Sequence, residues 1–343
     1  MINREAVEIA DRMRYYSDNY DCVFTYVHNV GETQAIVDYT DKVCRFCGKR
    51  YPDVKFKKKA HAVSELLGNK EFVLKNECDE CNIFFGQKLE DNLAKYIGLG
   101  RTLSQVFGKE GVPSYKSKDE SWRVDFTNKG LVIQMKENSN GVEEKDNYIL
   151  FHPVRDAYTP IAVYKALVKM ALSLLPYEKM PYFLDTVDWI KEGSHIISKY
   201  DMSNYAYMIE RFVPGPHTLC LRASGFIRKS FEKKVPYYIF LLEFQNYSYQ
   251  IIVPCRVKDG VLEELEEVDF VQIPGSDETL LENSFYGKPI SKLVDLHETS
   301  KIKGETFDLC LSLEHKELNE TRVNENVTEA FKKEGIILDK RLK

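Results

Sequence analysis

The sequence has no large excess of one charge sign and no apolar run long enough to cross a membrane. Its 343 residues include 48 Lys and Arg against 53 Asp and Glu, which gives a formal net charge of -5 at pH 7. A chain that binds nucleic acid over its whole surface usually carries a surplus of Lys and Arg, and this one does not. The most apolar helical stretch, residues 161–175, is interrupted by Lys165 and Lys169 and is shorter than the roughly 20 residues of a bilayer span. We therefore expect no membrane anchor.

Several other signals are missing as well. The opening residues MINREAVEIADRM are charged within the first five positions and lack the apolar core of a secretory signal. The glycines of residues 99–117 fit neither a phosphate-binding loop nor a dinucleotide-binding fingerprint. The remaining histidines show no paired metal-ligand spacing, and no site is expected at His152, His195, His217, His297 or His315. We expect a cytoplasmic globular chain of two domains.

Four of the eight cysteines form two tight pairs, Cys44 with Cys47 and Cys78 with Cys81. The other four are scattered singly, at positions 22, 220, 255 and 310. In a reducing compartment this pattern favours one metal site and isolated thiols over a disulfide framework. Each C-x-x-C can turn tightly and present two thiolates, and two such turns complete a tetrahedral site. The sequence therefore predicts one structural zinc held by the paired cysteines.

Hydrophobic periodicity predicts a mixture of helices and strands. We expect a helix over residues 3–16 and another from the second cysteine pair to about Gly98. Hairpins are predicted for SWRVDFT with GLVIQMK and for VPYYIFLLEF with YQIIVPC, and single strands for KFKKK, NYILF and TFDLCLSL.

The most apolar predicted helix begins at Thr159-Pro160 and runs to about Leu175. Proline suits the first helical position, where its missing N-H would have no partner anyway. Lys165, Lys169 and Ser173 recur four residues apart, and they predict one narrow solvent-facing stripe on an otherwise buried helix.

A change in composition suggests the domain boundary. Residues 99–117 are rich in Gly, Ser and Lys, which is typical of a connecting segment. We therefore expect an N-terminal part over residues 1–100 and an α+β domain of unknown recognition role over residues 101–343. Beyond His315 the chain is polar and predicts a surface helix or a frayed tail.

The residues between 40 and 100 resemble a known family. Their motifs follow the order seen in zinc-stapled HNH endonucleases. This order is a C-x-x-C pair, a basic segment, Ala60-His61, a G-N loop and then E-C-x-x-C-N at the start of a helix. They are similar, less closely, to bacterial proteins in which such a module precedes a longer α+β region. The resemblance implies a ββα-metal fold, in which a hairpin carries the histidine and the next helix supplies metal ligands. The expected fold class is α+β, with this module followed by a larger mixed domain.

The resemblance also implies a reaction, the hydrolysis of DNA phosphodiester bonds. Such hydrolysis needs a base that activates water and a cation that stabilises charge on the phosphate. His61 takes the family position of the general base, with a pKa near the operating pH. Asn82 takes the position of an oxygen ligand to a second ion, distinct from zinc and hard in character, Mg2+ or Mn2+.

The sequence departs from the family pattern at two expected ligand positions. Ala60 and Gly86 stand where many members carry a metal ligand, and Glu65 or Glu90 could take their place. The middle asparagine of the family signature also remains open, because Asn69 and Asn76 both fit it.

These departures leave an alternative function, a non-catalytic zinc-binding module for nucleic acid or protein, with the second domain as a ligand or partner sensor. In that case His61 is a core or capping residue, and the Asn82 side chain bonds the backbone at the helix start. Lys and Arg outnumber Asp and Glu between Cys44 and Lys109, while the rest of the chain is acidic. This basic segment favours double-stranded DNA as partner, although lysines 55–59 also fit a solvated edge strand. A protein partner or a second copy of the chain stays open.

Overall fold

The computed structural model describes residues 2–3, 9–28, 34–36, 42–128, 130–136, 139–145, 148–195, 201–215, 221–262, 265, 267–275, 288–312 and 336–339. The chain divides into two compact units, each built from separate stretches. Unit 1 comprises Met1–Leu93 and Thr159–Lys301, and unit 2 comprises Ala94–Tyr158 and Ile302–Lys343. This grouping differs from the division expected near residue 100, which remains a prediction about separately folding parts. The cysteine pairs thus belong to the same unit as the long apolar helix.

Unit 1 contains a six-stranded antiparallel sheet with the strand order β15-β10-β13-β12-β11-β2. Its strands are β2 (Tyr20–Val27), β10 (Tyr207–Phe212), β11 (Leu221–Arg228), β12 (Tyr238–Phe244), β13 (Tyr247–Val253) and β15 (Ile290–Asp295). The predicted hairpin of VPYYIFLLEF with YQIIVPC is confirmed as β12 and β13. Alternate residues of these strands face opposite sides of the sheet, and both sides are covered.

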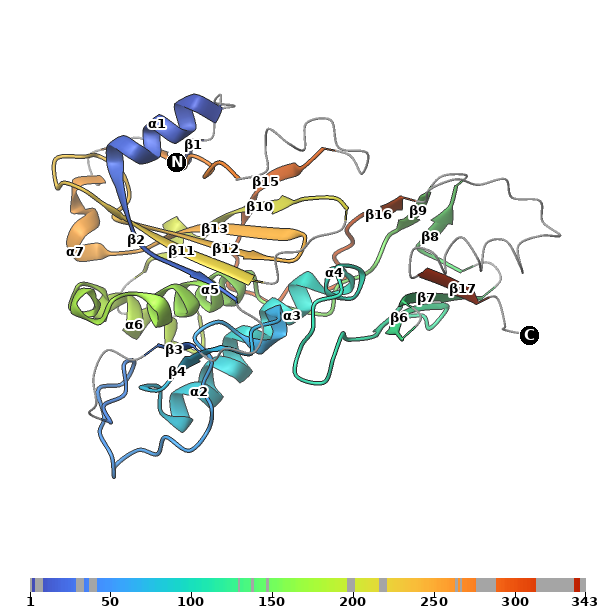
Figure 1. Ribbon diagram of the computed structural model, residues 1–343, viewed down its shortest axis with the longest axis horizontal. Helices are drawn as coiled ribbons and strands as arrows, with labels where there is room; N and C mark the ends of the chain where they lie inside the picture. Colours follow the sequence, from blue (N-terminus) through green and yellow to red (C-terminus); the bar gives the residue numbers. More distant parts are fainter. Residues whose placement is uncertain are drawn as a thin grey trace. The chain divides into compact units, whose positions relative to one another are not determined.

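Helices α1 (Ile9–Asn19) and α5 (Pro160–Leu174) lie on opposite faces of this sheet (Figure 1). Tyr16 of α1 belongs to the same buried cluster as Ile239 and Ile252 of the sheet. On the other face, the Tyr238 hydroxyl donates to the carbonyl of Ala171 on α5 at 3.0 Å. The predicted apolar helix is confirmed as α5. The predicted N-terminal helix is present from Ile9 onward as α1, and residues 4–8 lie outside the described part.

The solvent-facing stripe predicted on α5 is wrong. Lys165 and Lys169 are each 1% exposed, and Ser173 is fully buried. The sheet covers one side of α5, and the cysteine-containing module covers another, as the contacts of Lys169 with that module show. Polar spacing in the sequence indicated a distinct face correctly, but that face contacts protein and not water.

The cysteine-containing module, residues 42–93 of unit 1, is a small hairpin followed by a long helical run. Its elements are η1 (Glu65–Leu67), β4 (Phe72–Leu74), α2 (Asp79–Phe85), the π-helical turn η2 (Gly86–Glu90) and the start of α3 (Asp91–Ile97), and β3 (Gln34–Ile36) pairs in parallel with β4. The helix predicted from the second cysteine pair to about Gly98 is confirmed. This module and the larger sheet-containing part make the α+β fold class that was expected.

The short strand predicted for KFKKK is wrong. Residues 55–59 are irregular, and pairing with β4 begins only at the bridge between His61 and Val73. The physical reason is the carboxylate of Asp79, which accepts the backbone N-H groups of Lys57 and Lys58 at 2.9 and 2.8 Å. Those N-H groups are therefore not available for a strand ladder.

Unit 2 is built from two small sheets with the orders β17-β7-β6-β5 and β16-β9-β8. Its elements are α4 (Leu99–Leu103), β5 (Tyr115–Lys116), β6 (Trp122–Thr127), β7 (Gly130–Met135), β8 (Val142–Glu144), β9 (Tyr148–Phe151), β16 (Leu309–Ser312) and β17 (Ile336–Asp339). The hairpin of β6 with β7 and the strands β9 and β16 confirm predictions. Trp122, Ile133 and Phe151 are buried in the core of this unit. The polar segment at 313–335 lies outside the described residues.

The remaining elements of unit 1 are short. They are β1 (Ile2–Asn3), η3 (Tyr177–Phe183), α6 (Leu184–Ile190), η4 (Ser203–Tyr205), α7 (Arg256–Asp259), η5 (Gly260–Leu262) and β14 (Val268–Asp269), with β1 parallel to β14. Among the described residues, no helix combines the length and the apolar character needed to cross a bilayer.

Candidate metal centre and active site

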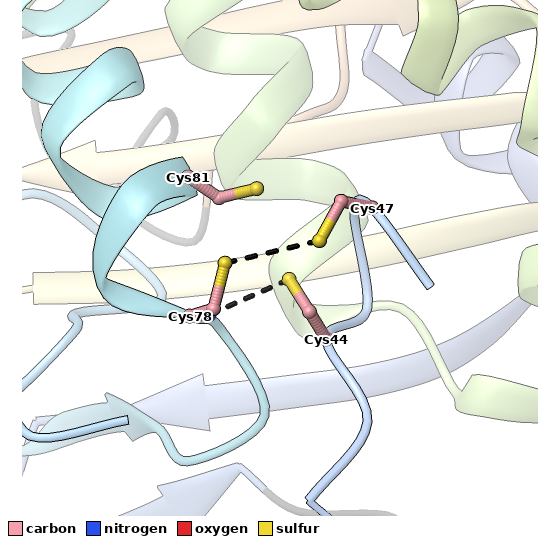
Figure 2. Close-up of side chains that lie close together, drawn as sticks. All are labelled: Cys44, Cys47, Cys78 and Cys81. Carbon is pink, nitrogen blue, oxygen red and sulfur yellow. Dashed lines mark hydrogen bonds between the residues drawn. The ribbon is translucent and has the colours of Figure 1, made fainter. Parts of the chain in front are cut away.

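The four paired cysteines converge on one point of the module (Figure 2). Cys44 and Cys47 lie on a tight turn, Cys78 precedes α2, and Cys81 lies in its first turn. Their sulfur atoms all lie within 4.8 Å of one another, and Cys47 Sγ is 3.8 Å from Cys78 Sγ. A tetrahedral zinc with Zn–S bonds of about 2.3 Å separates its sulfurs by about 3.8 Å. The cluster is therefore consistent with a structural zinc.

The chemistry of these thiols also calls for a cation. Burial raises the pKa of the Cys78 thiol to about 12, and a hydrogen bond with Cys44 raises the pKa of Cys81. The same bond lowers the pKa of Cys44 to about 4. Cys44 is thus ionised while Cys78 and Cys81 stay protonated, because negative charges so close together repel one another. A divalent ion would allow all four to ionise together.

The first cysteine turn is fastened to helix α5. Arg45, between the two cysteines, is buried, and its guanidinium donates to the carbonyls of Leu172, Ser173 and Leu175 at 2.9, 2.5 and 2.6 Å. These carbonyls belong to the C-terminal end of α5, where backbone acceptors lack helical partners and a positive charge is favourable. The metal centre and α5 therefore form one connected structure.

His61 lies on the hairpin, at the point where its two arms meet. The N-H of Ala62 donates to the carbonyl of Phe72, and the N-H of Leu74 donates to that of Ala60, both at 2.9 Å. His61 is buried, with 8% of the residue exposed. Burial, followed by the nearby charges of Lys59 and Lys169, lowers the pKa of His61 from 6.5 to about 4. The imidazole is therefore neutral near pH 7, the form that can accept a proton.

Asn69, and not Asn76, holds the His61 hairpin together. Asn69 is fully buried, and its Oδ1 accepts the backbone N-H groups of Glu71 and Phe72 at 3.1 and 2.9 Å. Its Nδ2 donates to the carbonyls of Val63 and Phe72 at 2.5 and 3.1 Å and lies 3.5 Å from His61 Nδ1. Among the described residues, the equally buried Asn76 side chain has no hydrogen-bond partner.

The two ring nitrogens of His61 have different neighbours. The Asn69 amide cannot be flipped, because its oxygen and nitrogen each have two backbone partners. Both N-H groups of its Nδ2 already donate to the carbonyls of Val63 and Phe72, and this nitrogen lies 3.5 Å from His61 Nδ1. On the other side of the ring, Glu65 Oε1 lies 3.4 Å from Nε2.

Asn82 and Glu90 lie on the helical run that follows the cysteines. Asn82 is partly exposed in the first turn of α2, and among the described residues its side chain has no hydrogen-bond partner. Glu90 lies two turns further on, about 12 Å along the helix, and accepts a hydrogen bond from Ser64. Glu90 is thus the helical carboxylate at the His61 segment. Apart from the cysteines, the described residues contain no group of three or more His, Cys, Asp or Glu side chains close enough to share an ion.

The sequence comparison agrees with this geometry. The model of the HNH endonuclease family matches residues 44–97. No curated protein and no solved structure matches the chain. The chain therefore carries an HNH endonuclease domain at residues 44–97, which includes nearly all of the cysteine-containing module.

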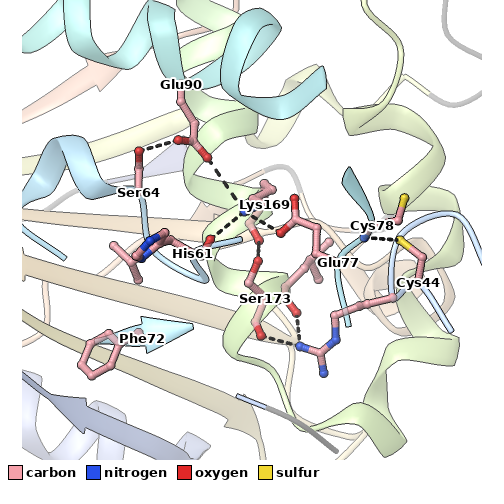
Figure 3. Close-up of polar contacts among 12 residues, drawn as sticks. Cys44, His61, Ser64, Phe72, Glu77, Cys78, Glu90, Lys169 and Ser173 are labelled. Atoms are coloured by element: carbon pink, nitrogen blue, oxygen red, sulfur yellow. Dashed lines mark hydrogen bonds and ion pairs between the residues drawn. The ribbon is translucent and has the colours of Figure 1, made fainter. Parts of the chain in front are cut away.

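Three contacts of this domain were not anticipated from the sequence. Lys169 of α5 donates to the carbonyl of His61 at 3.0 Å (Figure 3). Arg45 binds the end of α5, and His28, just after β2, forms a buried pair with Glu71. The four-residue spacing of Lys165, Lys169 and Ser173 indicated the face of α5 that includes the Lys169 contact, although this face was expected to be exposed to solvent.

We predict that Cys78→Ser removes the bound metal. The purified chain should contain about one zinc, and the variant should contain almost none, because three sulfurs and a hydroxyl hold zinc poorly. Elemental analysis after dialysis measures this directly. Cys22→Ser, at an exposed cysteine outside the cluster, is the control and should keep its zinc. Correctly folded protein without metal would contradict the assignment.

We also predict that Asn69→Ala destabilises the protein much more than Asn76→Ala. The first change leaves buried N-H and C=O groups without partners, each costing about 1–3 kcal/mol. The second removes an amide of equal size and burial that has no partner among the described residues. Denaturant unfolding of both variants measures the difference. Equal losses of stability would contradict the role of Asn69.

Proposed function

We propose that the protein is a metal-dependent endonuclease that hydrolyses DNA phosphodiester bonds, with His61 as general base. The single observation that carries this proposal is the position of His61 on the hairpin of a domain that matches the HNH endonuclease family. The pKa of His61, which burial lowers to about 4, supports it. A general base must be unprotonated before it acts, and burial gives His61 that state across the physiological pH range.

In this reaction the residues of the hairpin orient the base. Asn69 fixes the loop on the Nδ1 side of the ring, and Glu65 lies on the Nε2 side. The buried hairpin backbone and Asn69 limit rotation of the ring. The four cysteines act as scaffold, since they join the hairpin and α2 without touching the reacting atoms.

A catalytic Mg2+ or Mn2+ would supply charge stabilisation on the scissile phosphate. The described residues offer such an ion few ligands, with Asn82 in its family position and no carboxylate cluster around it. Mg2+ commonly keeps several waters and binds substrate phosphates directly. In this proposal Asn82 would contribute one oxygen, and water and the nucleic acid would contribute the others.

The basic loop before His61 supports nucleic acid as the substrate. Lys55, Lys57, Lys58 and Lys59 are exposed, and Asp79 fixes the backbone of this loop through two hydrogen bonds. Lysines held on a fixed loop beside the proposed base can neutralise phosphates on either side of the bond to be cut.

Two observations favour a second function, a zinc module that binds nucleic acid without cutting it. His61 is only 8% exposed, and the family ligand positions hold Ala60 and Gly86. A protein that retained DNA tightly but never cleaved it would fit this second function.

We predict that His61→Ala reduces plasmid cleavage by about 100-fold or more, the usual contribution of a general base. Nicking and linearisation assays with Mg2+, with Mn2+ and with EDTA measure this, and EDTA should abolish activity. His297→Ala, on the same unit but outside the domain, is the control and should cleave like the wild type. Undiminished cleavage by the His61 variant would refute the proposed base.

We also predict an unusual pH dependence. A histidine of ordinary pKa 6.5 is only about 3% neutral at pH 5, whereas one with a pKa of about 4 is about 90% neutral. Since the lowered pKa of His61 keeps the base unprotonated, kcat/KM should change little from pH 7 to pH 5 and fall only near pH 4. Circular dichroism at each pH checks the fold. A midpoint near 6.5 would show that His61 is not shielded as the structure indicates.

A further inference from the structure

We infer that Lys169, which lies outside the HNH endonuclease domain, is a positioning residue for His61. This inference rests on the proposed function and deepens it, since it adds a residue of helix α5 to the catalytic arrangement. Lys169 does not touch the reacting atoms, and it acts through the backbone that carries the imidazole.

The first observation is the position of the Lys169 ammonium. Its Nζ donates to the carbonyl of His61 at 3.0 Å and lies 3.0 Å from Glu77 Oε2 and 3.8 Å from Glu90 Oε1. Figure 3 shows these three groups arranged around the nitrogen. The hairpin, the segment before the second cysteine pair and the helical run therefore meet at one side chain.

The second observation is a further link through Glu90. Its Oε2 accepts a hydrogen bond from the hydroxyl of Ser64, three residues beyond His61. Lys169 therefore holds the 61–64 segment at both ends, directly at His61 and through Glu90 at Ser64. A segment fixed at both ends cannot shift its first residue without breaking a charged contact.

Burial makes this arrangement stiff. Lys169 is 1% exposed, and the Glu77 side chain is fully buried. A buried charge that loses its partner is strongly destabilising, so these groups are held together in the folded state. Small displacements of a catalytic group, of about 1 Å, can lower rates by about 100-fold. Lys169 thus affects turnover more than substrate binding.

The same helix offers a matched control. Lys165 lies one turn before Lys169 and is equally buried. Its Nζ donates to the carbonyl of Trp189 at 2.7 Å, and its bonds within the described part of the chain include none to the HNH endonuclease domain. Lys165→Met removes a buried ammonium from α5 just as Lys169→Met does. Because Lys169→Met alone leaves the Glu77 carboxylate unpaired, the cost in stability of Lys165→Met is to be compared with that of the double variant that also carries Glu77→Gln, while the effect on His61 should differ.

The experiment compares the wild type with Lys169→Met, the double variant Lys169→Met/Glu77→Gln and Lys165→Met. The double variant removes both charges of the buried pair and so avoids an unpaired carboxylate. We expect kcat to fall by about tenfold or more in both Lys169 variants, with KM for DNA within about twofold of the wild type. Lys165→Met should keep a kcat within about twofold.

Hydrogen exchange supplies a readout that does not need cleavage. The amides of residues 61–64 should exchange about tenfold faster in the double variant than in the wild type, and should be unchanged in Lys165→Met. Unaltered exchange of these amides, or a wild-type kcat in the folded double variant, would overturn the inference. If the wild type cleaves no nucleic acid, the proposed function fails, and the exchange data alone decide whether Lys169 holds the His61 segment.

Discussion

Four cysteine sulfurs lie so close together that they cannot all ionise unless a cation lies between them. Their separation fits tetrahedral zinc. Burial raises the pKa of Cys78, and the hydrogen bond between Cys44 and Cys81 lowers the pKa of Cys44 and raises that of Cys81. The remaining geometry of the domain depends on this centre. It joins the turn at residues 44–47 to the start of α2, and the hairpin with His61 lies between those two attachments in the chain.

The domain is also tied to helix α5 of the same unit. Arg45 binds the last carbonyls of α5, and Lys169 binds His61, Glu77 and Glu90. A family match ending at residue 97 therefore does not mark the physical limit of the domain. Because α5 also packs against the six-stranded sheet, the sheet supports the hairpin through one helix, and substitutions in residues 159–175 can alter the site without touching it.

Much of the domain could be predicted because its signals are local. Two C-x-x-C pairs predicted the metal centre, and helical periodicity predicted the run from Asp79 to Ile97. The apolar helix and the main hairpins followed from local periodicity in the same way. The family resemblance placed His61 on a hairpin, where the structure also has it.

The errors arose where distant residues decide the outcome. The strand expected at KFKKK is replaced by a loop because Asp79, more than 20 residues further along the chain, accepts hydrogen bonds from its backbone N-H groups. The polar stripe on α5 is buried because the HNH endonuclease domain covers it. No local sequence pattern distinguishes a solvent-exposed helix face from one that is covered by another part of the protein. The sequence also left Asn69 and Asn76 equivalent, and only the fold shows which of them has partners.

The central claim is that a DNA phosphate is cut between His61 and the helix that follows the cysteines. The most direct measurement is a crystal structure of the His61→Ala chain with double-stranded DNA and Mn2+, using the anomalous signal of manganese. The account predicts one phosphate facing position 61, with the metal between that phosphate and Asn82. DNA seated elsewhere on the chain, with no phosphate near position 61, would contradict it.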